Sequence, residues 1–196
     1  MSNELDELRK KAERADLPLK DGHNMVFGKG NPAAAIMFIG EAPGEKEDLA
    51  GMPFVGSAGK QLDKLLESIG LSIDDVYIAN ILKYRPPENR NPVHEEIVAH
   101  TPYLIDKIKI IRPKVIVTMG NFATRFVLAG FNTDKMKNVE GITKLHGKIQ
   151  SVSLNDSKFL VMPTYHPAAV LYNPKLRSEL EEDFMLLKKI MDASVV

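Results

Sequence analysis

The sequence predicts an α/β fold, a three-layer α/β/α sandwich with a central, mainly parallel four-stranded sheet. Four short, mostly apolar runs are separated by segments whose apolar residues have helical spacing, and the chain contains no internal repeat. Such runs suit strands that are buried on both faces, and their alternation with helices is typical of a parallel sheet. The 196 residues are close to the size of one domain. We therefore expect a single domain over 1–196.

The expected elements follow in chain order. The charged segment 2–17 has a thin apolar stripe at three- and four-residue spacing, which predicts an amphipathic N-terminal helix within residues 1–20. Segment 138–159 alternates polar and apolar residues around turn residues, which predicts a peripheral hairpin. The expected strands are 33–40, 75–82, 114–120 and 158–166. The other expected helices are 57–71, 93–111, 121–130 and 175–193.

Composition excludes several classes of protein. The chain has no cysteine, so no disulfides are expected. No apolar stretch exceeds about ten residues, which argues against a membrane span and a signal peptide and leaves a cytoplasmic location as the expectation. Lys plus Arg and Asp plus Glu both number 26, so nucleic-acid binding would need a local patch of positive charge.

Polar residues stand where the predicted strands end, namely Glu41, Asn80, Gly120 and His166. Each has an ordinary structural explanation when taken alone, because Gly120 can turn the strand into a helix and Asn80 or His166 can cap a strand. In open parallel sheets, however, ligands bind beyond the carboxyl ends of the strands. Their shared position favours one functional cleft.

Four motifs together resemble those of a known family. They are GEAPGEKEDLAGMPFVGSAGKQLDKLL, NILKYRPPENRNP, IRPKVIVTMG and YHPAAVL. In this order and spacing they resemble the uracil-DNA glycosylase superfamily, most closely its family 4, from about Val26 to the C-terminal helix. The resemblance implies a DNA repair enzyme that flips uracil out of DNA and hydrolyses its N-glycosidic bond, leaving an abasic site. Its partner would be uracil-containing DNA, single- or double-stranded.

The chemistry of this reaction explains the residue types. Bond cleavage leaves positive charge on the sugar and negative charge on the base, which calls for a donor near uracil O2 and a carboxylate or ordered water near the sugar. The resemblance implies His166 as the donor and Glu41 as the carboxylate, which either stabilises the sugar or positions the attacking water. The Asn80 amide can accept from N3–H and donate to O4 of uracil, and would be mispaired with cytosine.

The glycine-rich segment supplies the remaining candidates for the uracil pocket. Phe54 resembles the family's stacking ring, and a loop phenylalanine tucked into the core is the structural alternative. Ala42 stands where many relatives carry glycine, and its backbone is expected to approach the other face of the base. Glu47 is the candidate wall that excludes the 5-methyl group of thymine. Ser57 begins the next helix, where it either contacts a phosphate or caps the helix.

Two further segments are candidates for DNA contacts. Lys83, Arg85 and Arg90 lie on a proline-containing loop and predict a local phosphate clamp, with a solvated run of charge as the alternative. Val170 and Leu171 match the family's apolar wedge, which enters the minor groove as the base leaves. The next residue, Tyr172, stands where many relatives place arginine, so a phosphate contact is either lost or supplied by Lys175 or Arg177.

One departure from the family is large. Family 4 enzymes usually hold a 4Fe–4S cluster with four cysteines, and this chain has none. The vacated positions are Glu13, Asp16, Tyr84 and His100. Oxygen and imidazole groups cannot replace the thiolates, so no cofactor is expected. A different metal bound by Glu13, Asp16 and His100 is the less favoured alternative to a hydrogen-bonded or ion-paired replacement.

Two rival functions stay open at this stage. The chain could be a module that binds uracil-containing or abasic DNA without cleavage, or a glycosylase for another deaminated or mismatched base. The presence of both Glu41 and His166 argues against the binding module, because binding alone does not need the catalytic pair. A monomer is expected.

Overall fold

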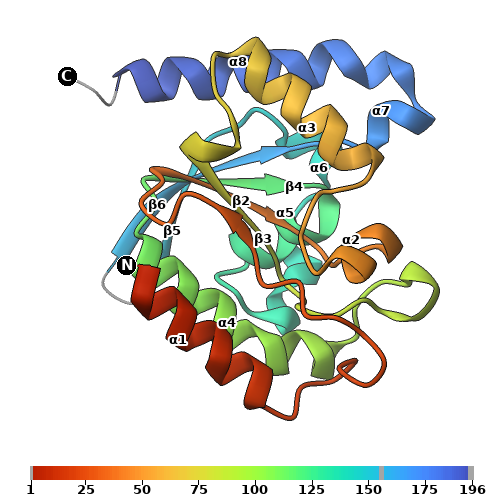
Figure 1. The fold of residues 1–196 in the computed structure, drawn as a ribbon. Coiled ribbons are helices and arrows are strands. Elements are labelled where there is room, and N and C mark those ends of the chain that lie inside the picture. The colour runs from red at the N-terminus through yellow and green to blue at the C-terminus, as the bar shows by residue number, and fades with distance from the viewer. Residues whose placement is uncertain (1, 155–156, 194–196) are drawn as a thin grey trace.

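The protein is built around a six-stranded sheet in the order β1-β3-β2-β4-β6-β5 (Figure 1). The computed structural model describes residues 2–154 and 157–193. The four middle strands run parallel and are the four predicted ones, β3 (Val76–Asn80), β2 (Ile36–Gly40), β4 (Val115–Met119) and β6 (Ser157–Thr164). Two antiparallel strands flank them, β1 (Lys29–Gly30) and β5 (Gln150–Leu154). The predicted count of four thus covers only the parallel part of the sheet.

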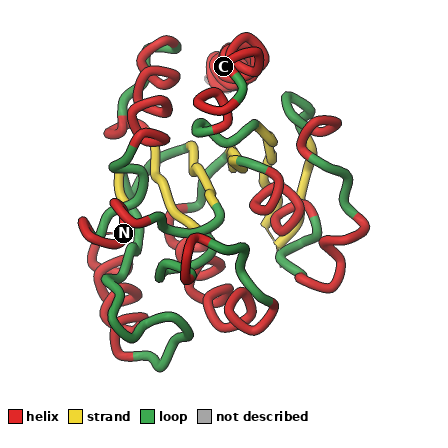
Figure 2. Tube along the Cα trace, turned by 90° about the vertical axis from the view of Figure 1, so that its right-hand side faces the viewer, coloured by secondary structure: helices red, strands yellow, loops and turns green. Residues whose placement is uncertain are grey.

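Helices cover both faces of the sheet (Figures 1 and 2). One layer contains α1 (Ser2–Arg14), α4 (His94–Ile111) and α5 (Asn121–Leu128). The other contains α3 (Ser57–Ser68) and α8 (Arg177–Ala193). Side chains of β2 alternate between the layers, because Ile36 and Phe38 belong to the core under α3 and α8 whereas Met37 and Ile39 belong to the core under α1 and α4. The predicted three-layer α/β/α sandwich is confirmed.

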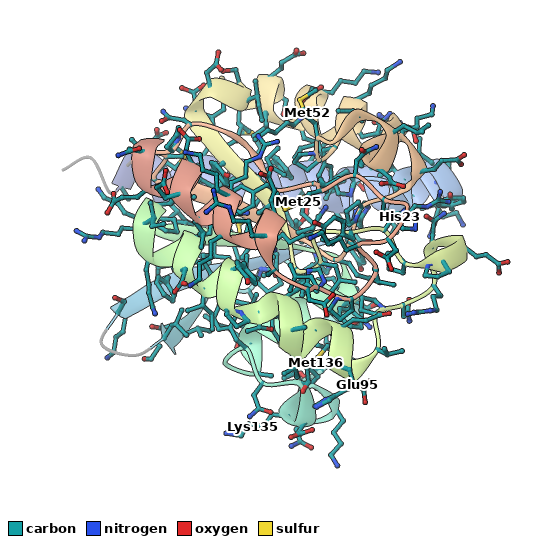
Figure 3. The ribbon with its side chains drawn as sticks, turned by 60° about the horizontal axis from the view of Figure 1, so that its bottom comes forward. His23, Met25, Met52, Glu95, Lys135 and Met136 are labelled. Carbon is teal, nitrogen blue, oxygen red and sulfur yellow. The ribbon has the colours of Figure 1, made fainter. Side chains whose placement is uncertain are left out.

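Shorter elements connect the layers. The short α-helices are α2 (Glu45–Ala50), α6 (Ile142–Leu145) and α7 (Ala169–Tyr172). The 3-10 turns are η1 (Ile73–Asp75), η2 (Pro87–Asn89), η3 (Thr133–Asn138) and η4 (Pro174–Leu176). Turn η3 packs against α4, and Figure 3 shows Met136 of η3 near Glu95 of α4. No helix within the described residues has both the length and the apolar character needed to cross a membrane.

Two predicted boundaries are wrong. The N-terminal helix ends at Arg14 rather than near residue 17 or 20, because Pro18 disfavours helical backbone before it and Lys20 Nζ bonds the carbonyls of Glu13 and Ala15 at the helix end. The predicted hairpin does form, between β5 and β6. It is not entirely peripheral, because its second strand, β6, also pairs with β4 in the parallel part of the sheet. Segment 138–159 also contains α6. Its positions 155–156 lie outside the described residues.

The carboxyl ends of the parallel strands meet at one edge of the sheet. Gly40 pairs with Asn80 at the ends of β2 and β3, and Met119 pairs with Thr164 near the ends of β4 and β6. The polar residues predicted at the strand ends therefore come together at this edge.

Candidate active site

A cavity of about 200 Å³ opens at this edge of the sheet. Its lining residues are Ala42, Gly44, Glu47, Phe54, Ala58, Asn80 and His166. All four predicted uracil-contacting residues and one of the two predicted catalytic residues are among them. Sequence reasoning missed Ala58 as a wall of the cavity, although it stands in the quoted GSAGK segment.

His166 is held in one chemical form. Its Nδ1 accepts a hydrogen bond from the Ala168 backbone N–H at 3.2 Å, which leaves the proton of a neutral ring on Nε2. Burial lowers the pKa of His166 to about 4, so the ring is neutral at pH 7. No protein group within the described part of the chain bonds Nε2. His166 is thus a neutral imidazole with an unused N–H donor.

Glycine at position 40 makes room for the side chains of Asn80 and Phe54. A Cβ on Gly40 would collide with Asn80 Oδ1 and would lie 3.3 Å from the Phe54 ring. The Asn80 side chain is only 2% exposed, and no hydrogen bond to its amide is found among residues 2–154 and 157–193. The amide borders the cavity, where a ligand can make the hydrogen bonds that the protein does not supply. The arrangement leaves the amide carbonyl as an acceptor and the amide N–H groups as donors for a ligand.

Phe54 is fixed by its backbone. Its φ of 52° is left-handed, and its carbonyl accepts a hydrogen bond from Lys29 Nζ at 3.0 Å. A Cβ on Gly59 would overlap this carbonyl, so glycine is required where α3 passes the loop. The ring stacks on His166 with centroids 5.6 Å apart and planes at 27°. The core and stacking interpretations of Phe54 are compatible, because the ring is buried and lines the cavity.

Glu47 closes the glycine-rich loop. Its Oε1 accepts hydrogen bonds from the backbone N–H groups of Val55 at 3.1 Å and Gly56 at 2.9 Å. Gly56 is the N-cap of α3, so the alternative of Ser57 as the cap is wrong. Glu47 satisfies the amides at this turn, and Ser57 is left exposed as the first helical residue.

Glu41 directly follows β2 and is partly buried. It is not among the residues that line the cavity. Burial raises the pKa of its carboxyl above the ordinary value. Among the described residues no side-chain partner neutralises this carboxylate, which stays available for charge that develops nearby.

Comparison with known proteins identifies the family. The model of the uracil DNA glycosylase superfamily matches residues 27–187. The chain belongs to this superfamily. It is 49% identical to a type-4 uracil-DNA glycosylase of Saccharolobus solfataricus over 88% of this chain and 79% of the relative. It is 49% identical to the type-4 enzyme of Archaeoglobus fulgidus, over 82% and 79%, and 42% identical to that of Thermotoga maritima, over 86% and 83%.

The predicted phosphate clamp of this superfamily member must be corrected. Lys83 is fully buried, and its Nζ donates to the carbonyls of Asn80 at 2.7 Å and Ile81 at 2.8 Å, so it cannot reach a phosphate. Arg90 forms two bonds of 2.9 and 2.5 Å to the Glu96 carboxylate, which already balances its charge. Within residues 2–154 and 157–193, Arg85 bonds only the neutral Asn89, at 2.8 Å. Of the three predicted residues, Arg85 retains an unbalanced charge.

The predicted wedge of this superfamily member also changes. Val170 and Leu171 both lie on α7, but Val170 is only 5% exposed and belongs to the core under α3 and α8. Leu171 is 45% exposed and Tyr172 is 88% exposed. A single short helical turn cannot direct neighbouring side chains to the same side. Val170 is therefore structural, and Leu171 remains the apolar wedge candidate beside an exposed tyrosine.

The vacated cluster positions do not fit an iron-sulfur cluster. His100 uses both ring nitrogens, because Nδ1 accepts from the Lys83 N–H at 3.0 Å and Nε2 donates to the Pro18 carbonyl at 3.1 Å. The buried Tyr84 ring meets His100 edge-on, and exposed Glu13 is paired with Arg9. No group of three or more His, Asp or Glu side chains suited to a metal ion exists among the described residues. Hydrogen bonds and ring packing fill this corner of the molecule.

Proposed function

We propose that this chain is a family 4-type DNA repair glycosylase that flips uracil out of DNA and hydrolyses its N-glycosidic bond, leaving an abasic site. Membership of the superfamily and the type-4 relatives support the class of activity. One observation carries the proposal for this chain. The cavity contains a buried amide at Asn80 and an imidazole N–H at His166 that both lack a protein partner among the described residues.

Base recognition falls to Asn80 and Phe54. The Asn80 amide accepts from N3–H and donates to O4 of a flipped uracil, while cytosine presents the opposite pattern and leaves the amide mispaired. The Phe54 ring stacks on the planar base. Ala42 lies against the base through its backbone, and Glu47 blocks a methyl group at C5. The cavity of about 200 Å³ suits one small ring system rather than a nucleotide.

Catalysis falls to His166 and Glu41. As the bond between C1′ and N1 breaks, its electron pair passes to the uracil ring, and His166 Nε2–H donates a hydrogen bond to O2, where negative charge grows. A donor that is fixed before the reaction starts stabilises this charge without reorganisation. The Glu41 carboxylate acts on the sugar side, where it stabilises positive charge and orients the water that attacks C1′.

The remaining roles are predictions about DNA and cofactors. Uracil-containing DNA is the partner, with Ser57 and Arg85 as phosphate contacts and Leu171 as the wedge. Because the chain lacks cysteine, purified protein is expected to be colourless and free of labile sulfide. A monomeric state and a cytoplasmic location stay predictions from the sequence.

A cleavage assay tests the proposal directly. Oligonucleotides carrying uracil, hypoxanthine, a G·T mismatch or only normal bases are incubated in single- and double-stranded form, and abasic sites are cleaved with alkali. Rapid cleavage at uracil alone is the expected result. Binding to uracil-containing DNA without cleavage would instead support the binding module, and preferred cleavage at another base would support the other rival.

Asn80→Asp serves as the matched variant for selectivity in this assay. A protonated aspartate can donate to N3 and accept from the amino group of cytosine. Uracil release should therefore fall while rejection of cytosine is relaxed. Unchanged selectivity would assign Asn80 a structural role.

A further inference from the structure

Lys83 lies directly behind the residue that faces the base. Its Nζ is fully buried and bonds the carbonyls of Asn80 and Ile81, which form the end of β3 and the first step beyond it. Strand β1 pairs with β3 only at Tyr77 and Ile78, so no neighbouring strand accompanies β3 on that side at Asn80. On that side the Lys83 amine, and not a neighbouring strand, donates to the Asn80 carbonyl.

The backbone of Lys83 is itself tied to two distant segments. Its N–H donates to His100 Nδ1 of α4 at 3.0 Å, and its carbonyl accepts from Val26 N–H at 2.8 Å. Both bonds are made by residues far away in sequence. Because the base of the side chain is anchored twice, the amine has little freedom to follow a shift of Asn80.

The burial of this amine is costly for the fold. Among the described residues no carboxylate pairs with Lys83, and apolar side chains of similar size usually give a more stable interior. Burial lowers the pKa of Lys83 to about 7, and the two bonded carbonyls match the two N–H donors of a neutral amine. A stability argument alone would favour methionine at this position. The bonds to the Asn80 segment provide the reason for a lysine.

We propose that Lys83 is a positioning residue, whose buried amine fixes the end of β3 so that the Asn80 amide keeps the orientation that recognises uracil. The inference rests on the proposed function, because Asn80 is the base-recognition residue in it. Lys83 does not touch the base. It acts through the backbone of Asn80 and Ile81.

Lys107 provides a matched control. It is also fully buried, its Nζ also donates to a backbone carbonyl, that of Phe27, and it lies 3.7 Å above the Phe27 ring centroid. No hydrogen bond joins its amine to Asn80 or Ile81 within the described residues. Lys83→Met and Lys107→Met therefore remove the same group from equally buried places, and only the first releases the Asn80 segment.

The experiment measures single-turnover release of uracil and cytosine from matched oligonucleotides by wild type and both variants. For Lys83→Met we expect uracil release to slow by about 10- to 100-fold, the effect of small misplacement of a recognition group, and the uracil-to-cytosine ratio to fall at least about tenfold. For Lys107→Met both quantities should stay within about twofold of wild type even where thermal stability drops. An unchanged ratio in Lys83→Met, or equal losses in both variants, overturns the proposal.

A second measurement needs no folded Lys83 variant. Wild-type protein carrying ¹⁵N-lysine is titrated with free uracil, and the buried amine signals are assigned with Lys107→Met. Saturation should shift the Lys83 Nζ signal and leave that of Lys107 in place, whereas an unmoved Lys83 signal overturns the proposal. Wild-type protein that neither binds uracil nor cleaves uracil-containing DNA would contradict the proposed function itself. Normal wild-type cleavage with either negative result for Lys83 would contradict only the role of Lys83.

Discussion

His166 beside the cavity and His100 in the core share two features, a lowered pKa and a backbone N–H bond at Nδ1, and they differ at Nε2. Burial lowers the pKa of each to about 4, and each accepts a backbone N–H at Nδ1, from Ala168 and Lys83 respectively. At Nε2 they differ, because His100 donates to the Pro18 carbonyl whereas His166 has no protein partner among the described residues.

The difference between the two histidines shows that the hydrogen bond missing at His166 Nε2 lies at the cavity. In the corner around His100 the ring bonds on both sides, so the histidine joins the N-terminal segment to α4 and to the loop after β3. At the cavity the same kind of donor has no protein partner among the described residues and is left for a ligand. A shifted pKa alone does not distinguish a structural histidine from a functional one; the unfilled Nε2 does.

The largest expected effect comes from removing the unfilled donor. His166→Ala should slow uracil release by about two to three orders of magnitude, because one preorganised donor to the developing charge is lost. The variant also loses the bond from the Ala168 N–H and the stacking on Phe54, so the melting temperature should fall modestly, while the affinity for abasic DNA should stay close to wild type. Single-turnover rates at saturating enzyme measure the effect. Wild-type rates in this variant would remove the main support for the mechanism.

His100→Leu should show the opposite pattern, with a large loss of stability and a small loss of cleavage rate. It leaves the Lys83 N–H and the Pro18 carbonyl without their partner, which should lower the free energy of unfolding by about 2–4 kcal/mol. The cleavage rate per folded molecule should fall less than about tenfold, because Val26 still anchors the Lys83 backbone and the Lys83 amine keeps its bonds to Asn80 and Ile81. Urea denaturation followed by circular dichroism measures the stability. Unchanged stability would show that the corner does not depend on these bonds.

The pH dependence should reflect Glu41 rather than a histidine of ordinary pKa. The pKa of His166 is lowered to about 4, so its donor form is already complete above that pH and no inflection is expected near pH 6.5. The pKa of Glu41 is raised by burial, so the rate should fall about tenfold per pH unit once the pH drops below this raised pKa. Single-turnover rates between pH 4.5 and pH 8 test this. Glu41→Gln should be slow and should lack this inflection, and an inflection that persists in Glu41→Gln would contradict the assignment.

The smallest effect concerns the two arginines of the predicted phosphate clamp. Arg85→Ala should lower the salt slope of DNA binding by about one unit, because its charge is unbalanced. Arg90→Ala is the matched control, since Glu96 already holds that guanidinium, and its slope should stay near wild type. Binding titrations at several salt concentrations measure both. Equal slopes in all three proteins would make Arg85 an ordinary surface charge.

Much of the fold and of the cavity could be predicted because the signal is local. Strands β2, β3 and β4 are fully buried, so each appears as an apolar run followed by a polar residue or glycine. The resemblance then supplied Phe54 and Glu47, which the periodicity could not single out. Strand β1 escaped prediction because two residues carry no pattern.

The errors concern side chains whose direction is set by distant partners. Lys83 is a charged residue in a loop, which favours the surface, but its side chain is buried, and its backbone accepts from the Val26 N–H and donates to His100 Nδ1. Val170 and Leu171 are both apolar. Because α7 packs on the face of the sheet that α8 covers, Val170 is buried and Leu171 is exposed. The residues next to them in sequence predict neither the burial of Lys83 nor which of Val170 and Leu171 is exposed.

The strand order also affects the chain while it is being synthesised. Strand β6 is the last of the parallel strands to leave the ribosome, yet it pairs directly with β4 and carries His166 just beyond its end. Until it arrives, the apolar β4 is an open edge that can pair with another nascent chain. The same late strand closes this edge and brings in the imidazole. A polypeptide without β6 is thus prone to aggregate and also lacks the imidazole needed to release uracil, and the pairing of β6 with β4 removes both defects.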